Sequence, residues 1–311
     1  MGCRIPHDVP EPLVAHAHRP EVHALAMPRE VRGEIEDVLL ECRRLPGLRL
    51  LRIYAPAARF VGDRPLPVLL VNDGHKAFEP ANHRRVPAWQ QTGTLQLHRV
   101  MDGMLCEDAV RPAVVVAIAT HARSRADQYV PMRTALGATG FGGDGDAYLD
   151  VLEHEVLPAV QASVPHLELS QACAERVLVG TSIGGVSALY GALARPSVFG
   201  AAIALSPSAW VDDGFLTRMA RANGDVRARI AADIGDAERA PIREHCLRLF
   251  AELSARGDGD VLATEVDGVH NEDSWRARLP RLLRHVLAVA GPAADPPTDP
   301  AVGPAAARPP G

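Results

Sequence analysis

The middle of the chain alternates short, continuous apolar runs with longer stretches in which apolar residues recur at helical spacing. A short continuous run is typical of a strand that is buried on both faces of a sheet. Such runs lie at residues 67–72, 113–119, 177–179 and 201–205, and two further strands are predicted at 227–234 and 261–266. Predicted helices occupy 148–160, 186–194, 244–253 and 274–290. This alternation predicts an α/β fold, in which a mainly parallel sheet carries helices on both faces.

Two further strand-like runs, Glu34–Cys42 and Leu48–Tyr54, precede the alternating pattern. The dipeptide Pro46-Gly47 lies between them and is a turn signal. Two strands joined by such a turn predict an N-terminal antiparallel hairpin.

Proline and small residues mark both ends of the chain. Residues 1–30 are rich in proline and histidine, and residues 291–311 are almost entirely Gly, Pro, Ala and Asp. We therefore expect a loosely ordered N-terminal arm (1–30), a single folded domain (31–290) and a disordered tail (291–311).

Composition narrows the classes of partner. Hydrophobic residues make up 47% of the 311 residues and the net charge is −5, so the chain lacks the basic excess of nucleic-acid-binding proteins. No apolar run approaches about 18 residues, the length of a membrane span. Prolines and charges also interrupt the N-terminal residues where a signal peptide needs an apolar core. These observations predict a cytoplasmic protein that binds neither nucleic acid nor a membrane, and they say nothing of its oligomeric state.

The cysteines and histidines do not form a recognisable metal or disulfide pattern. The five cysteines are widely spaced and include no CxxC pair, which argues against a disulfide framework and a structural zinc site. His16, His18 and His23 are conceivable metal ligands, but a solvated arm is the favoured interpretation. We expect no metal and no cofactor.

The stretch Gly180-Thr181-Ser182-Ile183-Gly184 lies between a predicted strand and a predicted helix. A strand, a sharp turn with serine at its apex and a helix make up the nucleophile elbow of serine hydrolases. The alternatives are a chance match in a glycine-rich chain and a phosphate-binding loop, which would need a lysine after its glycine. The context favours Ser182 as a catalytic nucleophile.

A serine nucleophile needs a histidine base and a carboxylate that orients the base, and in these hydrolases the chain order is serine, acid, histidine. His270 follows the last predicted strand and is the candidate base. Asp236 and Glu238 both follow the strand that ends at Ile234, and either fits as the acid, with Asp213 a more distant alternative. Ligands of parallel sheets bind beyond the carboxyl ends of the strands, so these side chains should converge on one edge.

The oxyanion formed on attack needs two N–H donors. The backbone N–H of Ile183, directly after the serine, is one candidate. The second should follow the strand at 67–72, where we assign His75, with Gly74 as the alternative.

Two long segments, 76–105 and 120–145, are expected to build the substrate pocket, because long loops within a domain are usually functional. The second is polar and glycine-rich and contains Arg123, Arg125 and Arg133. These arginines are candidates for contact with an anionic substrate, although solvated loop arginines are an equally good interpretation.

Several separated motifs resemble the putative-esterase family of α/β-hydrolases, which includes S-formylglutathione hydrolase, feruloyl and acetylxylan esterases, ferric-enterobactin esterase and the mycolyltransferases. The resemblance covers about residues 33–290, and its motifs lie at 52–56, 67–75, 127–131, 180–185, 199–208 and 268–276. It implies an α/β-hydrolase fold and carboxylic-ester hydrolysis through Ser182 and His270. Because the acid in similar members often lies three residues after a glycine, the resemblance also favours Glu238. It supports His75 as the second oxyanion donor.

The function expected is that of a serine esterase that acts on a small-molecule ester. One alternative is an acyltransferase, which forms the same acyl-enzyme but passes the acyl group to an alcohol or thiol. Another is an idle hydrolase fold used for binding, since a fold does not guarantee chemistry. The intact order of serine, acid and histidine argues against the idle fold. The sequence does not define the acyl and alcohol groups.

Overall fold

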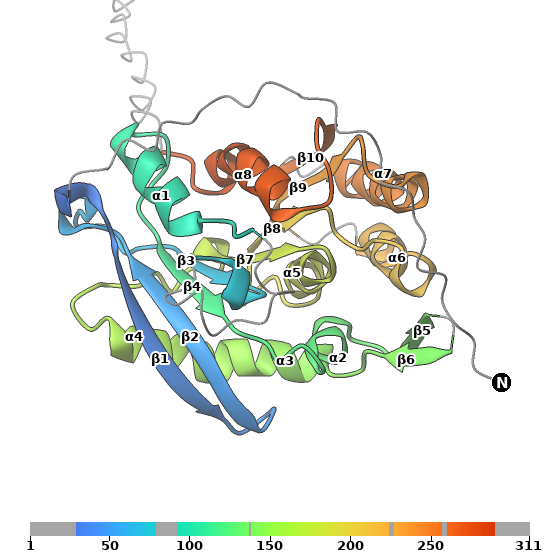
Figure 1. The fold of residues 1–311 in the computed structure, drawn as a ribbon, viewed down its shortest axis with the longest axis horizontal. Helices are drawn as coiled ribbons and strands as arrows, with labels where there is room; N and C mark the ends of the chain where they lie inside the picture. Colours follow the sequence, from blue (N-terminus) through green and yellow to red (C-terminus); the bar gives the residue numbers. More distant parts are fainter. Residues whose placement is uncertain (1–28, 79–92, 137, 224–226, 257–259, 290–311) are drawn as a thin grey trace, which may run out of the picture.

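An eight-stranded sheet runs through the centre of the molecule (Figure 1). The computed structural model describes residues 29–78, 93–136, 138–223, 227–256 and 260–289. The predicted N-terminal arm, with His16, His18 and His23, and the predicted tail therefore lie outside the described residues, apart from the last two residues of the arm. Residues 79–92 of the first expected pocket segment lie outside them as well.

The strand order across the sheet is β1-β2-β4-β3-β7-β8-β9-β10. The strands are β1 (Glu34–Cys42), β2 (Gly47–Ala55), β3 (Val68–Val71), β4 (Val114–Ile118), β7 (Arg176–Thr181), β8 (Ala201–Leu205), β9 (Arg229–Gly235) and β10 (Val261–Val266). β1 pairs antiparallel with β2, and β2 with β4, whereas all other neighbours are parallel. The predicted hairpin and the mainly parallel sheet are confirmed.

Helices cover both faces of the sheet, as predicted. One face carries α3 (Gly145–Val151), α4 (Leu157–Ser163), α5 (Ile183–Ala194), α6 (Phe215–Ala222) and α7 (Ala240–Ser254), and the other carries α1 (Leu97–Cys106) and α8 (Glu272–Val286). In Figure 1, α1 and α8 lie above the sheet and α3 and α4 below it. Successive residues of β3 pack into opposite layers, Leu69 against α1 and α8 and Leu70 against the other helices. Both faces are thus buried, which explains the continuous apolar runs.

The predicted helix at 148–160 is present and runs without a break from Gly145 to Ser163, but its middle is not α-helical. Between α3 and α4 the backbone passes through a π-helical segment, η6 (Leu152–Val156). Pro158 follows in the first turn of α4. Proline lacks an N–H and would clash with the carbonyl four residues earlier, and the wider π turn before it lets the helix continue.

The segment 120–145 is more ordered than the long loop expected from its sequence. It contains α2 (Arg125–Tyr129) and a two-stranded ribbon of β5 (Thr134–Leu136) and β6 (Thr139–Phe141). The carboxylate of Asp127 accepts a hydrogen bond from the Gly142 N–H at 2.9 Å, and the carbonyl of Gly142 accepts one from Arg133 at 2.8 Å. Side-chain hydrogen bonds of this kind, which close the segment on itself, are not visible in its composition.

Short 3₁₀ turns complete the described chain. They are η1 (Arg29–Val31), η2 (Ala58–Phe60), η3 (Gly74–Lys76), η7 (Cys173–Glu175) and η8 (Val211–Asp213). Of these, η3 matters for the site, because it follows β3 at the carboxyl edge of the sheet.

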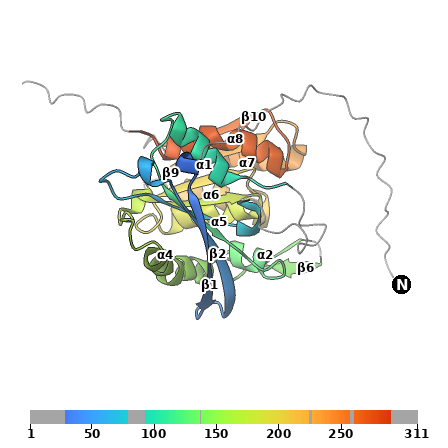
Figure 2. The ribbon, with the colours of Figure 1, turned by 60° about the vertical axis from the view of Figure 1, so that its left-hand side comes forward.

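The hairpin β1–β2 reaches beyond the helix layer at its turn end, as Figures 1 and 2 both show. Leu39 and Leu48 are exposed on it. Asp37 on the edge strand β1 forms an ion pair with Arg52 at 2.9 Å. Charged side chains on an edge strand oppose pairing with further chains.

Candidate active site

Ser182 lies at the junction of β7 and α5 with a φ of 53°. Residues with side chains rarely adopt this backbone conformation, and a strained apex is characteristic of a nucleophile elbow. Three main-chain hydrogen bonds hold it: its own N–H donates to the carbonyl of Leu205, and the N–H groups of Gly185 and Ser208 donate to its carbonyl, all at 3.0 Å. A Cβ at Gly180 would lie 2.0 Å from the carbonyl oxygen of Gly184. Only glycine therefore permits the strand and helix to approach this closely.

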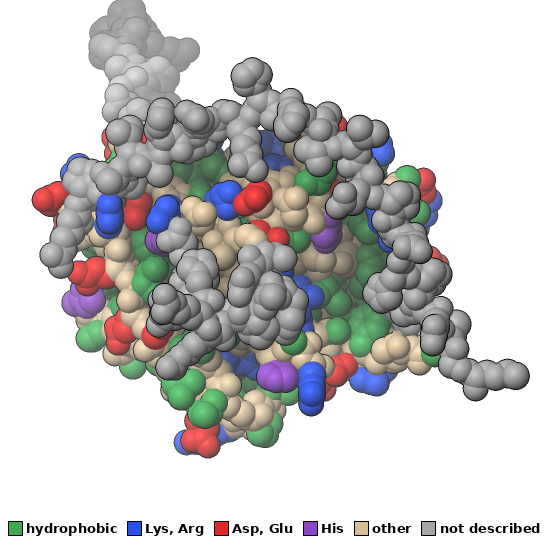
Figure 3. Space-filling view, in the orientation of Figure 1, with side chains coloured by type: hydrophobic (Ala, Val, Ile, Leu, Met, Phe, Trp, Pro, Cys, Tyr) green, Lys and Arg blue, Asp and Glu red, His purple; other side chains and the backbone are tan. Residues whose placement is uncertain are grey.

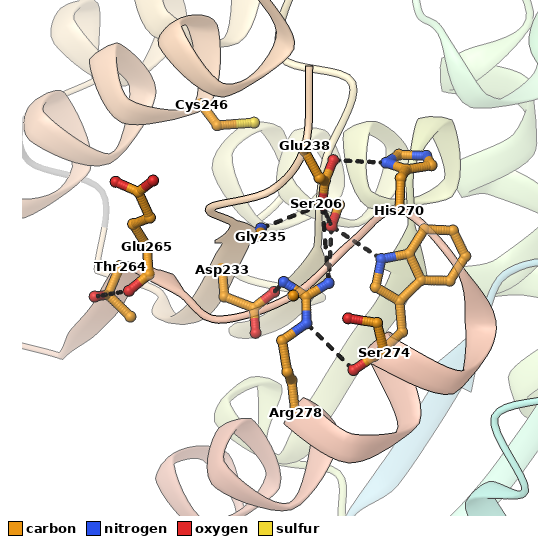
Figure 4. A network of polar contacts seen from close by, with 12 residues as sticks. Ser206, Asp233, Gly235, Glu238, Cys246, Thr264, Glu265, His270, Ser274 and Arg278 are labelled. Atoms are coloured by element: carbon orange, nitrogen blue, oxygen red, sulfur yellow. Dashed lines mark hydrogen bonds and ion pairs between the residues drawn. The ribbon is translucent and has the colours of Figure 1, made fainter. Parts of the chain in front are cut away.

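A continuous chain of contacts links three of the predicted residues. Nε2 of His270 lies 3.1 Å from Oγ of Ser182, and Nδ1 of the same ring lies 2.7 Å from Oε2 of Glu238. Figure 4 shows the contact between the acid and the ring. The Glu238 side chain is fully buried, whereas that of His270 is 37% exposed. In this arrangement the imidazole can accept the serine proton while the buried carboxylate fixes the orientation of the ring.

The structure distinguishes the two acids that the sequence left open. Glu238 contacts His270, as described above. The carboxylate of Asp236 is exposed and accepts a hydrogen bond from the N–H of Gly268 at 3.1 Å. Asp236 thus holds the backbone of the histidine loop rather than the imidazole. The third candidate, Asp213, lies in η8, where its carbonyl accepts a hydrogen bond from Arg218.

The second carboxylate oxygen of Glu238, Oε1, accepts hydrogen bonds from the hydroxyl of Ser206 and from the N–H of Gly235. Burial alone would raise the pKa of this carboxyl. The hydrogen bonds from His270, Ser206 and Gly235, together with the attraction of the imidazole, outweigh burial and hold the pKa below its usual value. Glu238 is therefore charged at neutral pH.

Ser206 is completely buried and is the centre of a hydrogen-bond network (Figure 4). Its oxygen accepts the indole N–H of Trp275 at 2.9 Å and Nη2 of Arg278 at 3.0 Å. These two donors occupy its lone pairs, so its single hydrogen is directed at Glu238. The Trp275 ring also meets the His270 ring edge to face, with centroids 4.9 Å apart.

A buried ion pair lies behind this network. Nη1 of Arg278, on α8, is 3.2 Å from Oδ1 of Asp233, on β9, and both side chains are buried. Burial raises the pKa of Asp233 to about 6, although the charge of Arg278 opposes the rise. Sequence reasoning assigned no role to Ser206, Asp233, Trp275 or Arg278. The available signal was an acidic residue, Asp233, with apolar neighbours on both sides in the predicted strand 227–234.

The two predicted oxyanion donors lie on adjacent segments. Ile183 is the first residue of α5, where N–H groups have no intrahelical acceptor and the helix dipole favours negative charge. His75 lies in η3, directly after β3, the neighbour of β7 in the sheet. The side-chain amide of Asn72 joins the two segments through a 2.9 Å hydrogen bond to the carbonyl of Gly184. Burial lowers the pKa of the His75 imidazole, which favours its neutral form.

Two of the three arginines considered for substrate binding are held by carboxylates. Arg125 forms a bidentate pair with Asp73, with both N–O distances at 2.6 Å. Arg133 lies 3.2 Å from Asp127. Arg123 is exposed. Arg125 therefore stabilises the loop that carries His75 instead of being free for an anion.

A mainly parallel sheet, a serine on a strand–turn–helix elbow and a histidine after the last strand define an α/β-hydrolase fold. Residues 44–286 match the model of the family described as putative esterase, and the chain belongs to that family. The resemblance noted in the sequence is confirmed.

Named relatives include siderophore esterases. The triacetylfusarinine C esterase of Aspergillus fumigatus is 34% identical over 156 residues, which is 48% of this chain and 46% of that protein. The iron(III) enterobactin esterase of Escherichia coli K12 is 27% identical over 253 residues, covering 78% of this chain and 55% of the relative. Among solved structures, the enterobactin esterase of Shigella flexneri determined with enterobactin superposes with a TM-score of 0.64. It is 23% identical and covers 81% of this chain and 58% of that one.

The chain spans about half the length of the Aspergillus fumigatus and Escherichia coli relatives. Among the described residues, no helix combines the length and apolar character that a membrane span requires. Within the same ranges, no group of three or more His, Cys, Asp and Glu side chains is placed to hold a metal ion.

Proposed function

We propose that the protein is a serine esterase, in which Ser182 is the nucleophile, His270 the general base and Glu238 the acid that orients the base. The observation that carries the proposal is the unbroken contact chain from Ser182 Oγ through His270 to Glu238. Membership of the putative esterase family supports the same reaction.

The reaction proceeds in two halves. Ser182 Oγ attacks the ester carbonyl carbon and its proton passes to Nε2 of His270, while the N–H groups of Ile183 and His75 bind the oxyanion. The imidazolium then gives the proton to the departing alkoxide, which leaves as the alcohol. Water attacks the acyl-enzyme with His270 again as base, releasing the acid and the free serine. Glu238 accepts the Nδ1–H of His270 and stabilises the imidazolium in both halves.

We propose ester bonds of siderophores as the substrate class. The support is the named activity of two relatives, one an esterase of triacetylfusarinine C and the other of iron(III) enterobactin. Over the part of the visible face that the described residues form, basic and acidic side chains are interspersed (Figure 3). This face therefore gives no support for a substrate that binds to a strongly charged surface. The cytoplasmic location remains a prediction of the sequence.

Turnover of p-nitrophenyl acetate by wild type and Ser182→Ala tests the mechanism. The variant should fold and should lose about 10⁴–10⁶-fold in rate, as is typical when a triad member is removed. A fluorophosphonate should add its mass to Ser182 in the wild type and to no residue of the variant. A folded Ser182→Ala protein with full turnover would contradict the mechanism.

The substrate class is tested separately, by chromatography of the products from triacetylfusarinine C and enterobactin, each with and without bound iron. Hydrolysis of p-nitrophenyl acetate without cleavage of either siderophore would retain the esterase and reject the substrate class. The same assay with added alcohols measures any acyl transfer.

A further inference from the structure

Lys76 and Glu272 form an ion pair that joins two segments of the site. Lys76 directly follows His75 in η3, and Glu272 is the first residue of α8, two residues after His270. The pair therefore connects the loop that carries the second proposed oxyanion donor with the loop that carries the proposed base. The two residues are 196 positions apart in the sequence.

Further hydrogen bonds and an ion pair fix the two loops that carry Glu272 and Lys76. On the histidine side, Asn271 caps α8 by accepting the N–H of Ser274 at 2.9 Å, and the hydroxyl of Ser274 accepts the N–H of Val269 at 3.0 Å. On the other side, Asp73 is clamped by Arg125. His75 is thus flanked by two residues that are both fixed by ion pairs.

The segment Gly93–Leu95 packs against the pair. The N–H of Leu95 donates to the carbonyl of Lys76 at 2.8 Å, and Arg276 of α8 donates to the carbonyl of Thr94 at 2.8 Å. The side chain of Glu272 is only 9% exposed and that of Lys76 is 31% exposed. A pair shielded to this degree is screened by salt less than a surface pair, and its geometry is more strongly fixed.

The lysine is unusual in this chain. Lysine and arginine together number 33, and Lys76 is the only lysine. An ammonium is a compact charge on a flexible stem, whereas a guanidinium is a broad planar fork. The position next to His75 is thus the one place where the chain uses the compact cation.

We infer that Lys76 and Glu272 are positioning residues, which hold the His75 N–H and the His270 imidazole at a fixed separation during catalysis. This inference rests on the proposed esterase mechanism. The base and the oxyanion donors must act on the same tetrahedral centre, and a displacement of about 1 Å can cost about 100-fold in rate. Loss of the pair should lower kcat and leave KM nearly unchanged, because neither residue is needed to bind the ground state.

The first test compares Lys76→Met, Lys76→Arg, Glu272→Gln and the double variant Lys76→Met/Glu272→Gln. We expect about a 10–100-fold lower kcat in Lys76→Met, with KM within about threefold of wild type. Lys76→Arg keeps the charge but not the compact shape, so its kcat should lie between those of Lys76→Met and wild type. The double variant leaves no charge unpaired, so it should fold, and its loss of kcat should be about that of one single variant.

Arg111→Met is the matched control. Arg111 forms a similarly shielded ion pair with Glu175, but that pair lies before the amino ends of β4 and β7, at the opposite edge of the sheet from Ser182. Its loss should lower the melting temperature without lowering kcat.

Chemical modification provides a second test, because only one side chain carries a primary amine. Acetylation removes the charge of Lys76, whereas reductive methylation keeps it. Acetylated enzyme should lose kcat and methylated enzyme should retain it. The same reagents applied to the Lys76→Arg variant measure any effect through the α-amino group or other side chains.

Three results would be decisive against the inference. These are a folded Lys76→Met protein with wild-type kcat, equal losses of kcat in Lys76→Met and Arg111→Met, or equal activity of acetylated and methylated enzyme. Each leaves the proposed esterase intact if wild type still shows turnover that depends on Ser182. A wild-type protein without such turnover would reject the proposed function and, with it, this inference.

Discussion

Ser206 donates its hydroxyl hydrogen to Oε1 of Glu238, the oxygen that faces away from His270. The donors that orient this hydroxyl, Trp275 and Arg278, both belong to α8. The histidine loop also ends at the first turn of α8. One helix therefore fixes the proposed base directly and the proposed acid through a buried serine.

Replacement of Ser206 by alanine should impair both stability and activity. The change removes a hydrogen bond to Glu238 and leaves the buried indole N–H of Trp275 without an acceptor. An orphaned buried donor costs about 1–3 kcal/mol, so we expect that loss in the free energy of unfolding from denaturant titration. A less firmly held acid should also lower kcat/KM by about 10-fold or more. Ser163→Ala, which removes the 2.8 Å bond of Ser163 to a carbonyl in α4, is the control. Equal effects of the two substitutions would argue against the role of Ser206.

The two acids after β9 should respond differently to amide substitution. Glu238→Gln keeps the shape of the side chain but cannot stabilise the imidazolium, so kcat should fall by about 10³-fold or more. Asp236→Asn keeps an oxygen that can accept the Gly268 N–H, and its kcat should stay within about 10-fold of wild type. Steady-state kinetics on p-nitrophenyl acetate measure both. A larger loss in Asp236→Asn than in Glu238→Gln would reverse the assignment of the acid.

The strands and the elbow could be predicted from the sequence because their physical causes are local. A strand covered on both faces is apolar at most of its positions, and the runs at β3 and β4 show this directly. The sharp turn at Ser182 requires glycine where strand and helix meet, and Gly180 and Gly184 in the sequence indicate such a turn. Such causes lie within a few residues of their effects.

The contacts around the proposed acid and between the two loops of the site could not be predicted, because the residues meet only after folding. Ser206 and Arg278 are 72 positions apart, and Lys76 and Glu272 are 196 apart. Which of Asp236 and Glu238 contacts His270 depends on the direction in which each side chain points from the turn after β9. Their spacing of two residues does not determine that direction, and the resemblance to a family was what favoured Glu238.

The buried carboxylates Asp233 and Glu238 should make opposite contributions to the pH dependence of stability. The pKa of Asp233 is raised from 3.8 to about 6 in the folded protein, so the folded state binds the extra proton, and this stabilisation is lost as the pH rises between these values. The pKa of Glu238 is lowered, so its contribution is present above the usual value of 4.5 and is lost as the pH falls below it.

Denaturant titrations from pH 4 to pH 7 test this contrast. Relative to wild type, Asp233→Asn should gain stability across that range, by an amount on the order of a few kcal/mol. Glu238→Gln should show its largest deficit at pH 7 and a smaller one at pH 4. A stability difference between Asp233→Asn and wild type that does not change with pH would contradict the raised pKa of Asp233.

The close approach of β7 and α5 at the elbow should make Gly180 far less tolerant of substitution than an open loop glycine. A Cβ at position 180 would meet the carbonyl of Gly184 at 2.0 Å, a contact that only movement of β7 or α5 can relieve. Gly180→Ala should therefore lower the melting temperature and reduce fluorophosphonate labelling of Ser182 together. Gly62→Ala is the matched control, since a Cβ there meets nothing within 4 Å, and it should be neutral or stabilise by up to about 1 kcal/mol. Differential scanning calorimetry gives the first quantity and mass spectrometry the second. If Gly180→Ala melted and labelled like Gly62→Ala, close contact between β7 and α5 would not be what holds Ser182 in its strained conformation.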